Sequence, residues 1–254
     1  MTTLQQLADG LAAWTLVSVR GAGAAAMTAV GTVHRLPAGL SQSTVLELVQ
    51  NWDHTSDALV KWTPSGDDLG DCQLDAPLLY PPKVLCAGAN YRKHLAEMGV
   101  PAPGDDWEPF FFLKPPTTTV IAPDADIVVD WTAELNLDWE AELAAVIGRG
   151  GKNIAVSDAL DHVAAYTVVN DVSARGPHHR PNSPAPPFEW DWLASKCGDG
   201  FCPIGPGIVP AFLVPERPVP LAALDRKART LAIILVEQAC RPIAHVVGHH
   251  RLHI

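Results

Sequence analysis

The chain has 254 residues, of which 48% are hydrophobic and 18% charged, enough to bury the core of one large domain or of one domain with a small companion. Its formal net charge of -10 argues against a nucleic-acid-binding surface, which would be basic. No run of about 18 apolar residues is present, so we expect no membrane-spanning segment.

Cysteine usage and the N-terminus indicate a cellular compartment. The five cysteines are scattered and form no Cys-x-x-Cys pair, which favours a reducing environment over a disulfide framework or a zinc ribbon. The N-terminus lacks a basic segment followed by a long apolar run, so no secretory signal is predicted. We therefore expect a cytoplasmic protein.

The first 80 residues carry signals for two helices and two short strands. Helices are expected over residues 3–14 and 44–52, and strands over 15–21 and 29–36. Thr44 and Glu47 have the spacing of a capping box at the start of the second helix. Turn and proline signals cluster before residue 80, so we place a domain boundary there.

Beyond residue 80, strands alternate with short helices. Strands are expected over residues 83–90, 110–123, 137–148 and 165–175, and helices over 91–99 and 157–164. Ser157 is the expected N-cap of the last of these helices. The proline-rich segment 176–193 is predicted to be a loop.

The strand expected over residues 137–148 carries an acid at every second position. Asp138, Glu140 and Glu142 would share one face, with apolar residues on the other. A solvated strand face is one interpretation. A divalent-metal site is the other, because hard cations such as Mg²⁺ prefer carboxylate oxygens. Asp171 could add a third ligand if the helix over 157–164 acts as a crossover that brings the two strands together.

Two further groups could take part in catalysis. His94 and Glu97 lie three residues apart on a predicted helix, so they face the same side and could form a general base. A surface ion pair is the alternative. Lys196 could neutralise an anionic substrate or a developing enolate, although a solvated surface lysine fits the same pattern.

Two other motifs are interpreted as structural. Gly21, Gly23 and Ala26 match the Gly-x-Gly-x-x-Gly/Ala pattern of dinucleotide-binding loops, but the next expected strand follows too soon for a crossover helix. We interpret them as a hairpin turn. The pairs His178–His179 and His249–His250 lack partners at zinc spacing and are taken as loop and tail histidines.

Five segments occur in the order of a known family. They are KVLCAGANYRKHLAEMG, PFFFLKP, LDWEAELAAVIG, AAYTVVNDVSAR and SKCGDGFCPIGPGIV. Across roughly residues 80–210 the chain resembles the fumarylacetoacetate hydrolase family, in the branch of acylpyruvases, oxaloacetate decarboxylases and related hydratases and isomerases. The resemblance implies an α+β, mostly β fold, with a mixed β-sandwich or roll as catalytic domain over 81–254. A small α/β domain over 1–80 would precede it, and the protein would form a homodimer.

The resemblance also implies a role for individual residues. The implied ligands of Mg²⁺ or Mn²⁺ are Glu140, Glu142 and Asp171. The implied catalytic residues are His94, Glu97 and Lys196. The implied substrate-binding residues are Arg92, Lys114 and Arg175.

The implied reaction is hydrolysis of a carbon–carbon bond in a 2,4-dioxo acid of the acylpyruvate or fumarylpyruvate type, as in the catabolism of aromatic compounds. His94, supported by Glu97, would activate a water, and the metal and Lys196 would hold the pyruvate enolate. Decarboxylation, hydration or isomerisation of a 2-oxo acid is the alternative within the family. A metal-binding pseudoenzyme is the alternative outside catalysis.

The chain departs from the family pattern at two places. Gly176 stands where the Ser-Ala-Arg motif is usually followed by an acid, and an unusual loop comes after it. After Pro210 the family's later glycine-rich segments have no counterpart, although residues 230–241 could replace one family strand. We consider two hypotheses for this C-terminus: the tail is truncated, or it is encoded in another reading frame. In either case a wall of the pocket would be missing, which would favour the pseudoenzyme.

Overall fold

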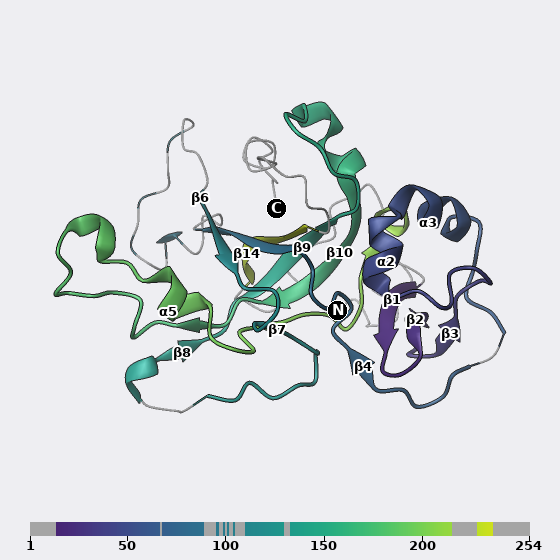
Figure 1. The fold of residues 1–254 in the computed structure, drawn as a ribbon, viewed down its shortest axis with the longest axis horizontal. Helices are drawn as coiled ribbons and strands as arrows, with labels where there is room; N and C mark the ends of the chain where they lie inside the picture. Colours follow the sequence, from purple (N-terminus) through teal and green to yellow (C-terminus); the bar gives the residue numbers. More distant parts are fainter. Residues whose placement is uncertain are drawn as a thin grey trace, which may run out of the picture.

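A computed structural model provides the fold of the protein (Figure 1). It describes residues 14–66, 68–88, 95, 96, 99, 101, 104, 110–129 and 133–214, and the backbone of 228–235. The helix expected over 3–14 and nearly all of the helix expected over 91–99 lie outside these residues.

The N-terminal part contains a four-stranded sheet in the order β3-β2-β1-β4. The bounds of these strands are Val33–Arg35, Gly23–Thr28, Trp14–Val19 and Leu74–Asp75. β1 and β2 form an antiparallel hairpin, which confirms the turn interpretation of the glycine motif. The strand expected over 29–36 contains β3, whereas β2 was not predicted. Gly21 adopts a positive φ of 76°, which lets the chain reverse directly after β1.

Two helices cover this sheet. α2 spans Val45–Gln50, and its capping box is confirmed: the Glu47 amide donates to Thr44 Oγ1 at 3.1 Å and the Thr44 amide donates to Glu47 Oε2 at 2.7 Å. α3 spans Trp52–Leu59 and was not predicted. Its sequence is mostly polar. Thr55 is nevertheless buried, and its hydroxyl donates to the Leu48 carbonyl at 2.8 Å.

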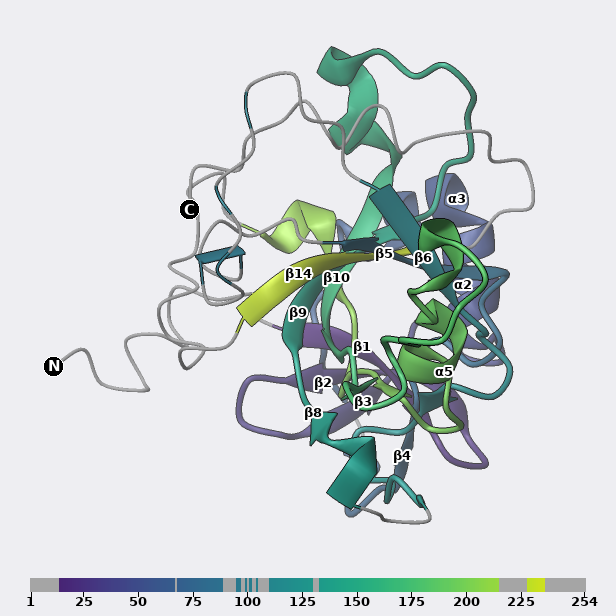
Figure 2. The ribbon, with the colours of Figure 1, turned by 90° about the vertical axis from the view of Figure 1, so that its left-hand side faces the viewer.

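The larger sheet has six strands in the order β13-β10-β9-β14-β5-β6. Their bounds are Val209–Pro210, Val163–Asn170, Ala141–Ile147, Ala228–Leu235, Lys83–Gly88 and Phe110–Lys114. β14 pairs parallel with β9 and antiparallel with β5, and Figure 2 shows it crossing the middle of the sheet. The C-terminal segment thus supplies a central strand, in line with its expected role as a replacement strand.

Shorter elements complete the described structure. Two small sheets pair β8 with β11 and β7 with β12, whose bounds are Leu137–Asp138, Ser173–Ala174, Val120–Ile121 and Cys202–Pro203. The short helices are η1 Ala133–Leu135, η2 Val156–His162, η3 Pro186–Phe188, α5 Trp192–Lys196 and η4 Ala211–Leu213. Among the described residues, no helix has the length and apolar character that a membrane crossing requires.

Three predicted strands are each divided in the structure. The run 137–148 forms β8 and β9, and the run 165–175 forms most of β10 and all of β11, because β8 pairs with β11 whereas β9 pairs with β10. The run 110–123 forms β6 and β7, which are separated by a turn that begins after Pro115.

The predicted crossover helix before β10 was wrong in type and topology. The segment forms the 3₁₀ helix η2, in which the Ser157 hydroxyl donates to Asp158 Oδ1 at 2.7 Å instead of capping the helix. β9 and β10 are antiparallel, so the connection between them reverses the chain and is no parallel crossover.

One hydrophobic core joins the two sheets. Trp14 and Leu16 of β1 belong to the same buried cluster as Val84 of β5 and Val146 of β9. Leu16 and Ile208 also exchange backbone hydrogen bonds of 2.8 and 2.9 Å. The fold is mostly β with a small N-terminal part, and the domain boundary at residue 80 stays a prediction.

Candidate active site

The acids of the central strand lie on its core face. Along β9 the positions alternate, and Glu142 shares a face with the buried Ala144 and Val146. Glu140 and Glu142 are only 2% and 1% exposed, so the interpretation of a solvated strand face is excluded for them. Asp138 belongs to β8 and is only partly buried.

The register of β9 and β10 brings Asp171 to these acids. Glu142 lies opposite Val169, and Ala141 lies opposite Asn170, the last residue of β10. The Asp171 amide then donates to the Glu140 carbonyl at 2.9 Å, and the Glu140 amide donates to Asn170 Oδ1 at 3.1 Å. Asp171 is fully buried, so three carboxylates from two neighbouring strands meet in the interior.

Three cations from three other elements complete what we call the buried charge cluster. Its members are Glu140, Glu142, Asp171, Lys114, Arg175 and Lys196. Lys196, the last residue of α5, donates to Glu140 Oε2 at 2.8 Å and to Asp171 Oδ2 at 2.7 Å. Lys114, the last residue of β6, pairs with Asp171 Oδ1 and donates to the Val172 carbonyl at 3.2 Å.

Arg175 joins the cluster at its edge. Its guanidinium pairs with Glu140 Oε1 and approaches Asp138 Oδ2 at 3.3 Å. Asp138 is thus held by Arg175, in keeping with its omission from the expected metal ligands. All the sequence-predicted cluster residues meet in space, although Lys196 and Glu140 are 56 positions apart in the chain.

The cations fix the protonation of the carboxylate that they hold. Burial by itself raises the pKa of Glu140, but Lys196 and Arg175 outweigh it and lower this pKa to about 2. Burial likewise lowers the pKa of Lys196, but Asp171 and Glu140 outweigh it and raise this pKa above its usual value. At neutral pH Glu140 and Lys196 are therefore both charged.

Two carboxylates of the cluster and a neighbouring cysteine lie close enough together to bind one metal ion. Ligand atoms of Glu142, Asp171 and Cys86 all lie within 4.8 Å of one another, and all three residues are buried. Glu142 and Asp171 were predicted ligands, whereas Glu140 faces Lys196 and Arg175 and its metal role stays a prediction. Cys86 was missed, because only the pairing of β5 with β14 and of β14 with β9 brings it close.

The donor set suits a hard cation better than a thiophilic one. Burial raises the pKa of the Cys86 thiol, and the nearby carboxyl groups of Asp171 and Glu142 raise it further. A protonated thiol is a poor ligand, whereas carboxylates are oxygen donors of the kind that Mg²⁺ and Mn²⁺ prefer. The residues therefore fit such a metal.

Some predicted residues lie outside the described part of the chain. These are Arg92, His94 and Glu97, so their catalytic and substrate-binding roles stay predictions. His249 and His250 also lie outside it.

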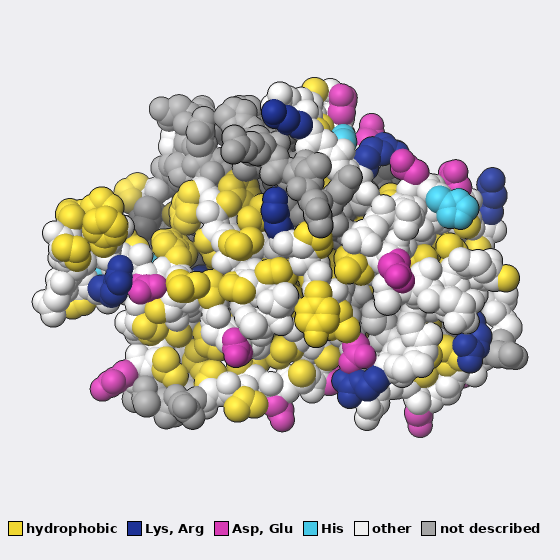
Figure 3. Space-filling view, in the orientation of Figure 1, with side chains coloured by type: hydrophobic (Ala, Val, Ile, Leu, Met, Phe, Trp, Pro, Cys, Tyr) yellow, Lys and Arg dark blue, Asp and Glu magenta, His cyan; other side chains and the backbone are white. Residues whose placement is uncertain are grey.

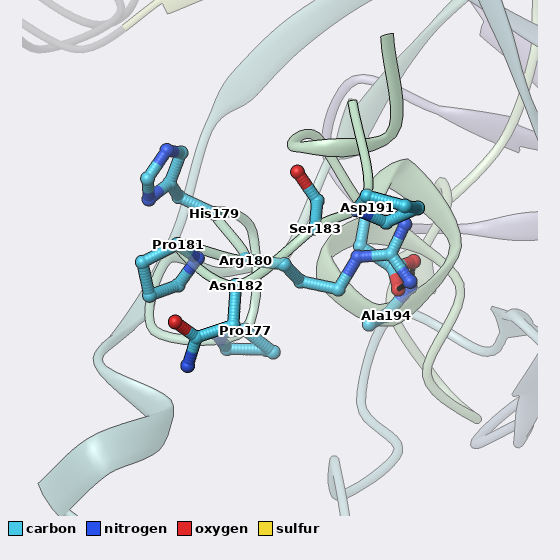
Figure 4. Close-up of a pocket in the computed structure, with 9 residues that line it drawn as sticks. Pro177, His179, Arg180, Pro181, Asn182, Ser183, Asp191 and Ala194 are labelled. Atoms are coloured by element: carbon cyan, nitrogen blue, oxygen red, sulfur yellow. Dashed lines mark hydrogen bonds and ion pairs between the residues drawn. The ribbon is translucent and has the colours of Figure 1, made fainter. Parts of the chain in front are cut away.

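A pocket of about 500 Å³ lies in the loop before α5 and not at the charge cluster (Figure 4). It is lined by Pro177, His179, Arg180, Pro181, Asn182, Ser183, Pro184, Asp191 and Ala194. Arg180 pairs with Asp191 at 3.4 Å and donates to the Phe188 carbonyl at 2.7 Å, so its guanidinium is already engaged. Hydrophobic side chains gather at this end of the molecule in Figure 3.

Comparisons with known proteins agree with the fold. The family model described as "Fumarylacetoacetate (FAA) hydrolase C-terminal" matches residues 83–230, more than half of the chain. Oxaloacetate tautomerase fahd2, a mitochondrial protein of Xenopus laevis, is 42% identical over 140 residues, which are 53% of this chain and 39% of that protein.

Two further relatives match longer parts. The Mycobacterium tuberculosis protein Rv2993c is 40% identical over 182 residues, which are 71% of this chain and 61% of that protein. The structure of a fumarylacetoacetate hydrolase from Exiguobacterium antarcticum matches with a TM-score of 0.56 and 28% identity, over 78% of this chain and 66% of that one. The matches span less than two thirds of each of these three relatives. On the extent of the family match, this chain belongs to the fumarylacetoacetate hydrolase family of enzymes.

Proposed function

We propose that the protein is a divalent-metal-dependent hydrolase that cleaves a carbon–carbon bond of a 2,4-dioxo acid such as an acylpyruvate. The observation that carries this proposal is the buried charge cluster. Burying ionisable groups such as Glu140 and Lys196 costs free energy that an apolar core of the same volume would not. A role in catalysis would explain why the protein buries these groups although their burial does not stabilise the fold.

The carboxylates support the metal part of the proposal. Glu142 and Asp171 present oxygens within reach of one ion, and Glu140 lies beside them as the third predicted ligand. A bound Mg²⁺ or Mn²⁺ would supply Lewis-acid stabilisation of negative charge that develops on substrate oxygens.

The lysines and the arginine support the choice of an anionic substrate. The Lys196 ammonium lies between Glu140 and Asp171 and can neutralise the charge of an enolate that forms beside it. Lys114 and Arg175 hold the carboxylates of Asp171 and Glu140 in place. We propose that all three cations also favour entry of a carboxylate-bearing substrate.

The remaining step requires a base. We propose that His94, with Glu97 three residues later, removes a proton from the water that attacks the 4-oxo carbon. The bond between C3 and C4 then breaks, its electron pair stays on the pyruvate fragment as an enolate, and the acyl group leaves as a carboxylic acid. Protonation of the enolate at C3 gives pyruvate.

A tautomerase is the second candidate. The oxaloacetate tautomerase of Xenopus laevis shares 42% identity over 140 residues of this chain. Interconversion of keto and enol oxaloacetate needs the same stabilised enolate, but it moves a proton at C3 without attack by water. The same cluster would serve it, and only the reaction catalysed separates the two candidates.

The test is a turnover panel with purified protein. Pyruvate release from acetylpyruvate, benzoylpyruvate, fumarylpyruvate and oxaloacetate is measured with Mg²⁺, with Mn²⁺ and with EDTA, and the ultraviolet decay of enol-oxaloacetate is followed in parallel. Glu140→Gln is the site variant. Asp53→Asn is the matched control, because the Asp53 side chain is exposed and pairs with the exposed Arg149.

Each outcome selects one reading. Metal-dependent pyruvate release from a dioxo acid that Glu140→Gln loses and Asp53→Asn keeps would support the hydrolase. Enol decay without pyruvate release would favour the tautomerase, and pyruvate release from oxaloacetate alone would favour a decarboxylase. A folded protein that binds Mn²⁺ and turns over none of these compounds would be the pseudoenzyme.

A further inference from the structure

Aromatic rings lead outward from the buried charge cluster. The Lys196 ammonium lies 5.3 Å from the ring centre of Phe112. Phe112 stacks on Trp192 at 5.1 Å, and Phe110 meets the same indole edge-on at 5.2 Å. We call Phe110, Phe112, Trp190 and Trp192 the aromatic wall. Phe110 and Trp190 are 43% and 53% exposed, so the wall runs from the buried lysine to the surface.

His178 is the polar member of this arrangement. Its ring lies 4.6 Å from Trp192 and 5.2 Å from Trp190, edge-on to both. Burial lowers its pKa, and the positive charges of Lys196 and Arg175 lower it further, so the ring is neutral at pH 7. The histidine that sequence reasoning took for an ordinary loop residue thus lies within the field of the charge cluster.

One ring nitrogen of His178 has no partner within the described structure. Nδ1 is buried and makes no hydrogen bond there, although the residue as a whole is only half-buried. A proton on Nδ1 would be an unsatisfied buried donor, which is costly. The favoured tautomer therefore carries its proton on Nε2, and this N–H is the group that a ligand oxygen can reach.

Backbone hydrogen bonds fix the conformation of the loop that carries His178. The Asp191 amide donates to the His178 carbonyl at 2.8 Å, and the Arg180 amide donates to the Glu189 carbonyl at 2.8 Å. His179 and Trp190 form an antiparallel bridge between these bonds. Pro177, His179 and Asp191 line the loop pocket of Figure 4, whereas the His178 ring contacts Trp190 and Trp192. The Trp190 ring contacts both histidines, with ring centres 5.2 Å apart in each case.

We propose that His178 contacts the substrate through Nε2–H and that the aromatic wall accepts a flat aromatic group on the acyl side of a 2,4-dioxo acid. This proposal rests on the proposed function and names its substrate class. The oxo-acid end of the substrate belongs beside Lys196 and the carboxylates. The acyl end then extends along Phe112, Trp192 and His178, where indole and phenyl faces stack with an aryl ring.

The experiment compares two substrates that differ only in the acyl group. We expect the wild-type protein to have a kcat/KM for benzoylpyruvate at least about tenfold above that for acetylpyruvate, from ring stacking. His178→Ala should lower the kcat/KM for both substrates about tenfold, as for one lost hydrogen bond. His178→Gln, which keeps an N–H donor, should recover most of this loss.

Neighbouring residues provide matched controls. His179→Ala removes the adjacent histidine, which is exposed and lies on the pocket side of the loop. Trp190→Ala should reduce the benzoylpyruvate preference, whereas Phe188→Ala removes an equally exposed aromatic residue of the same loop and should not. Thermal unfolding of each variant shows whether the fold is kept.

Failure of this proposal differs from failure of the proposed function. No loss in His178→Ala, the same loss in His179→Ala, or an undiminished benzoylpyruvate preference in Trp190→Ala would overturn it. If the wild type turns over neither compound, calorimetric binding to the Mn²⁺-loaded protein decides. Tighter binding of benzoylpyruvate than of acetylpyruvate, with the difference reduced in Trp190→Ala and the binding of both weakened in His178→Ala, upholds the proposal, whereas equal or absent binding of both overturns it.

Discussion

Ion pairs occur in both parts of the molecule, but in opposite surroundings. In the N-terminal sheet, Arg20 and Asp75 meet at 2.7 Å, and the Arg20 side chain is 58% exposed. In the larger sheet, Lys196 meets Glu140 and Asp171 at 2.8 and 2.7 Å, and none of these side chains is more than 4% exposed. The distances are alike, so solvent access is what separates them.

The two kinds of ion pair differ in how much they contribute to the stability of the fold. An exposed pair such as Arg20–Asp75 contributes about 0–1 kcal/mol. A buried cluster loses the solvation of every charge, and apolar residues of the same size would often give equal or greater stability. The N-terminal pairs can therefore be read as ordinary surface contacts, whereas the buried cluster calls for a functional explanation.

Glu142→Gln should have the largest effect. It removes a negative ligand from the carboxylate set, and a loss of several kcal/mol of metal-assisted catalysis corresponds to about 10³-fold or more in turnover. Turnover and Mn²⁺ binding by electron paramagnetic resonance are the measurements. Asp75→Asn in the exposed pair should leave both unchanged, and full Mn²⁺ affinity in Glu142→Gln would contradict the assignment.

Lys196→Met tests the stability side of the comparison. It leaves Glu140 and Asp171 buried with less positive charge, which should cost about 3–5 kcal/mol of unfolding free energy in EDTA. Arg20→Met should cost less than about 1 kcal/mol. Urea unfolding measures both, and Mg²⁺ should return part of the loss in Lys196→Met. Equal losses in the two variants would erase the distinction between the regions.

Acid should destabilise the metal-free protein through Glu140. Its pKa falls from 4.5 in the unfolded chain to about 2 in the fold, so the unfolded state binds the proton first as pH decreases. The stabilisation is complete above about pH 4.5 and is lost as pH falls towards 2. It amounts to about 3 kcal/mol.

Urea unfolding in EDTA between pH 7 and 2 measures this dependence. Glu140→Gln is the control, because it cannot titrate and its curve should be flatter in this window. Equal slopes in the two proteins would show that Glu140 does not carry the effect.

Gly176→Ala should give the smallest of these effects. A Cβ at this position would lie 1.6 Å from the Glu134 carbonyl oxygen, so the backbone of η1 must shift. Forcing an extra carbon into packed surroundings costs about 1–3 kcal/mol. Thermal unfolding measures it, with His179→Ala in the same loop as control. This contact explains why glycine stands where the family motif usually has an acid, and an unchanged melting temperature would refute that explanation.

Local sequence signals predicted the elements that depend on near neighbours. The capping box of Thr44 and Glu47, the turn at Gly21 and the alternation along β9 each depend on residues a few positions apart. The resemblance to the family added Lys114 and Arg175 to the earlier candidate Lys196, and the structure brings all three to the carboxylates. The resemblance did not identify Cys86 or His178 as candidate site residues.

The sequence by itself determined which residue types occur at which period, such as the acids two apart on a predicted strand. Only the tertiary structure decided that β10 runs antiparallel to β9, that β14 lies between β9 and β5, and that the His178 ring meets Trp190 and Trp192. The physical reason is the separation along the chain of the residues that interact. Periodicity and capping are set by bonds within a few residues, whereas strand order and the meeting of distant side chains depend on how the whole core packs.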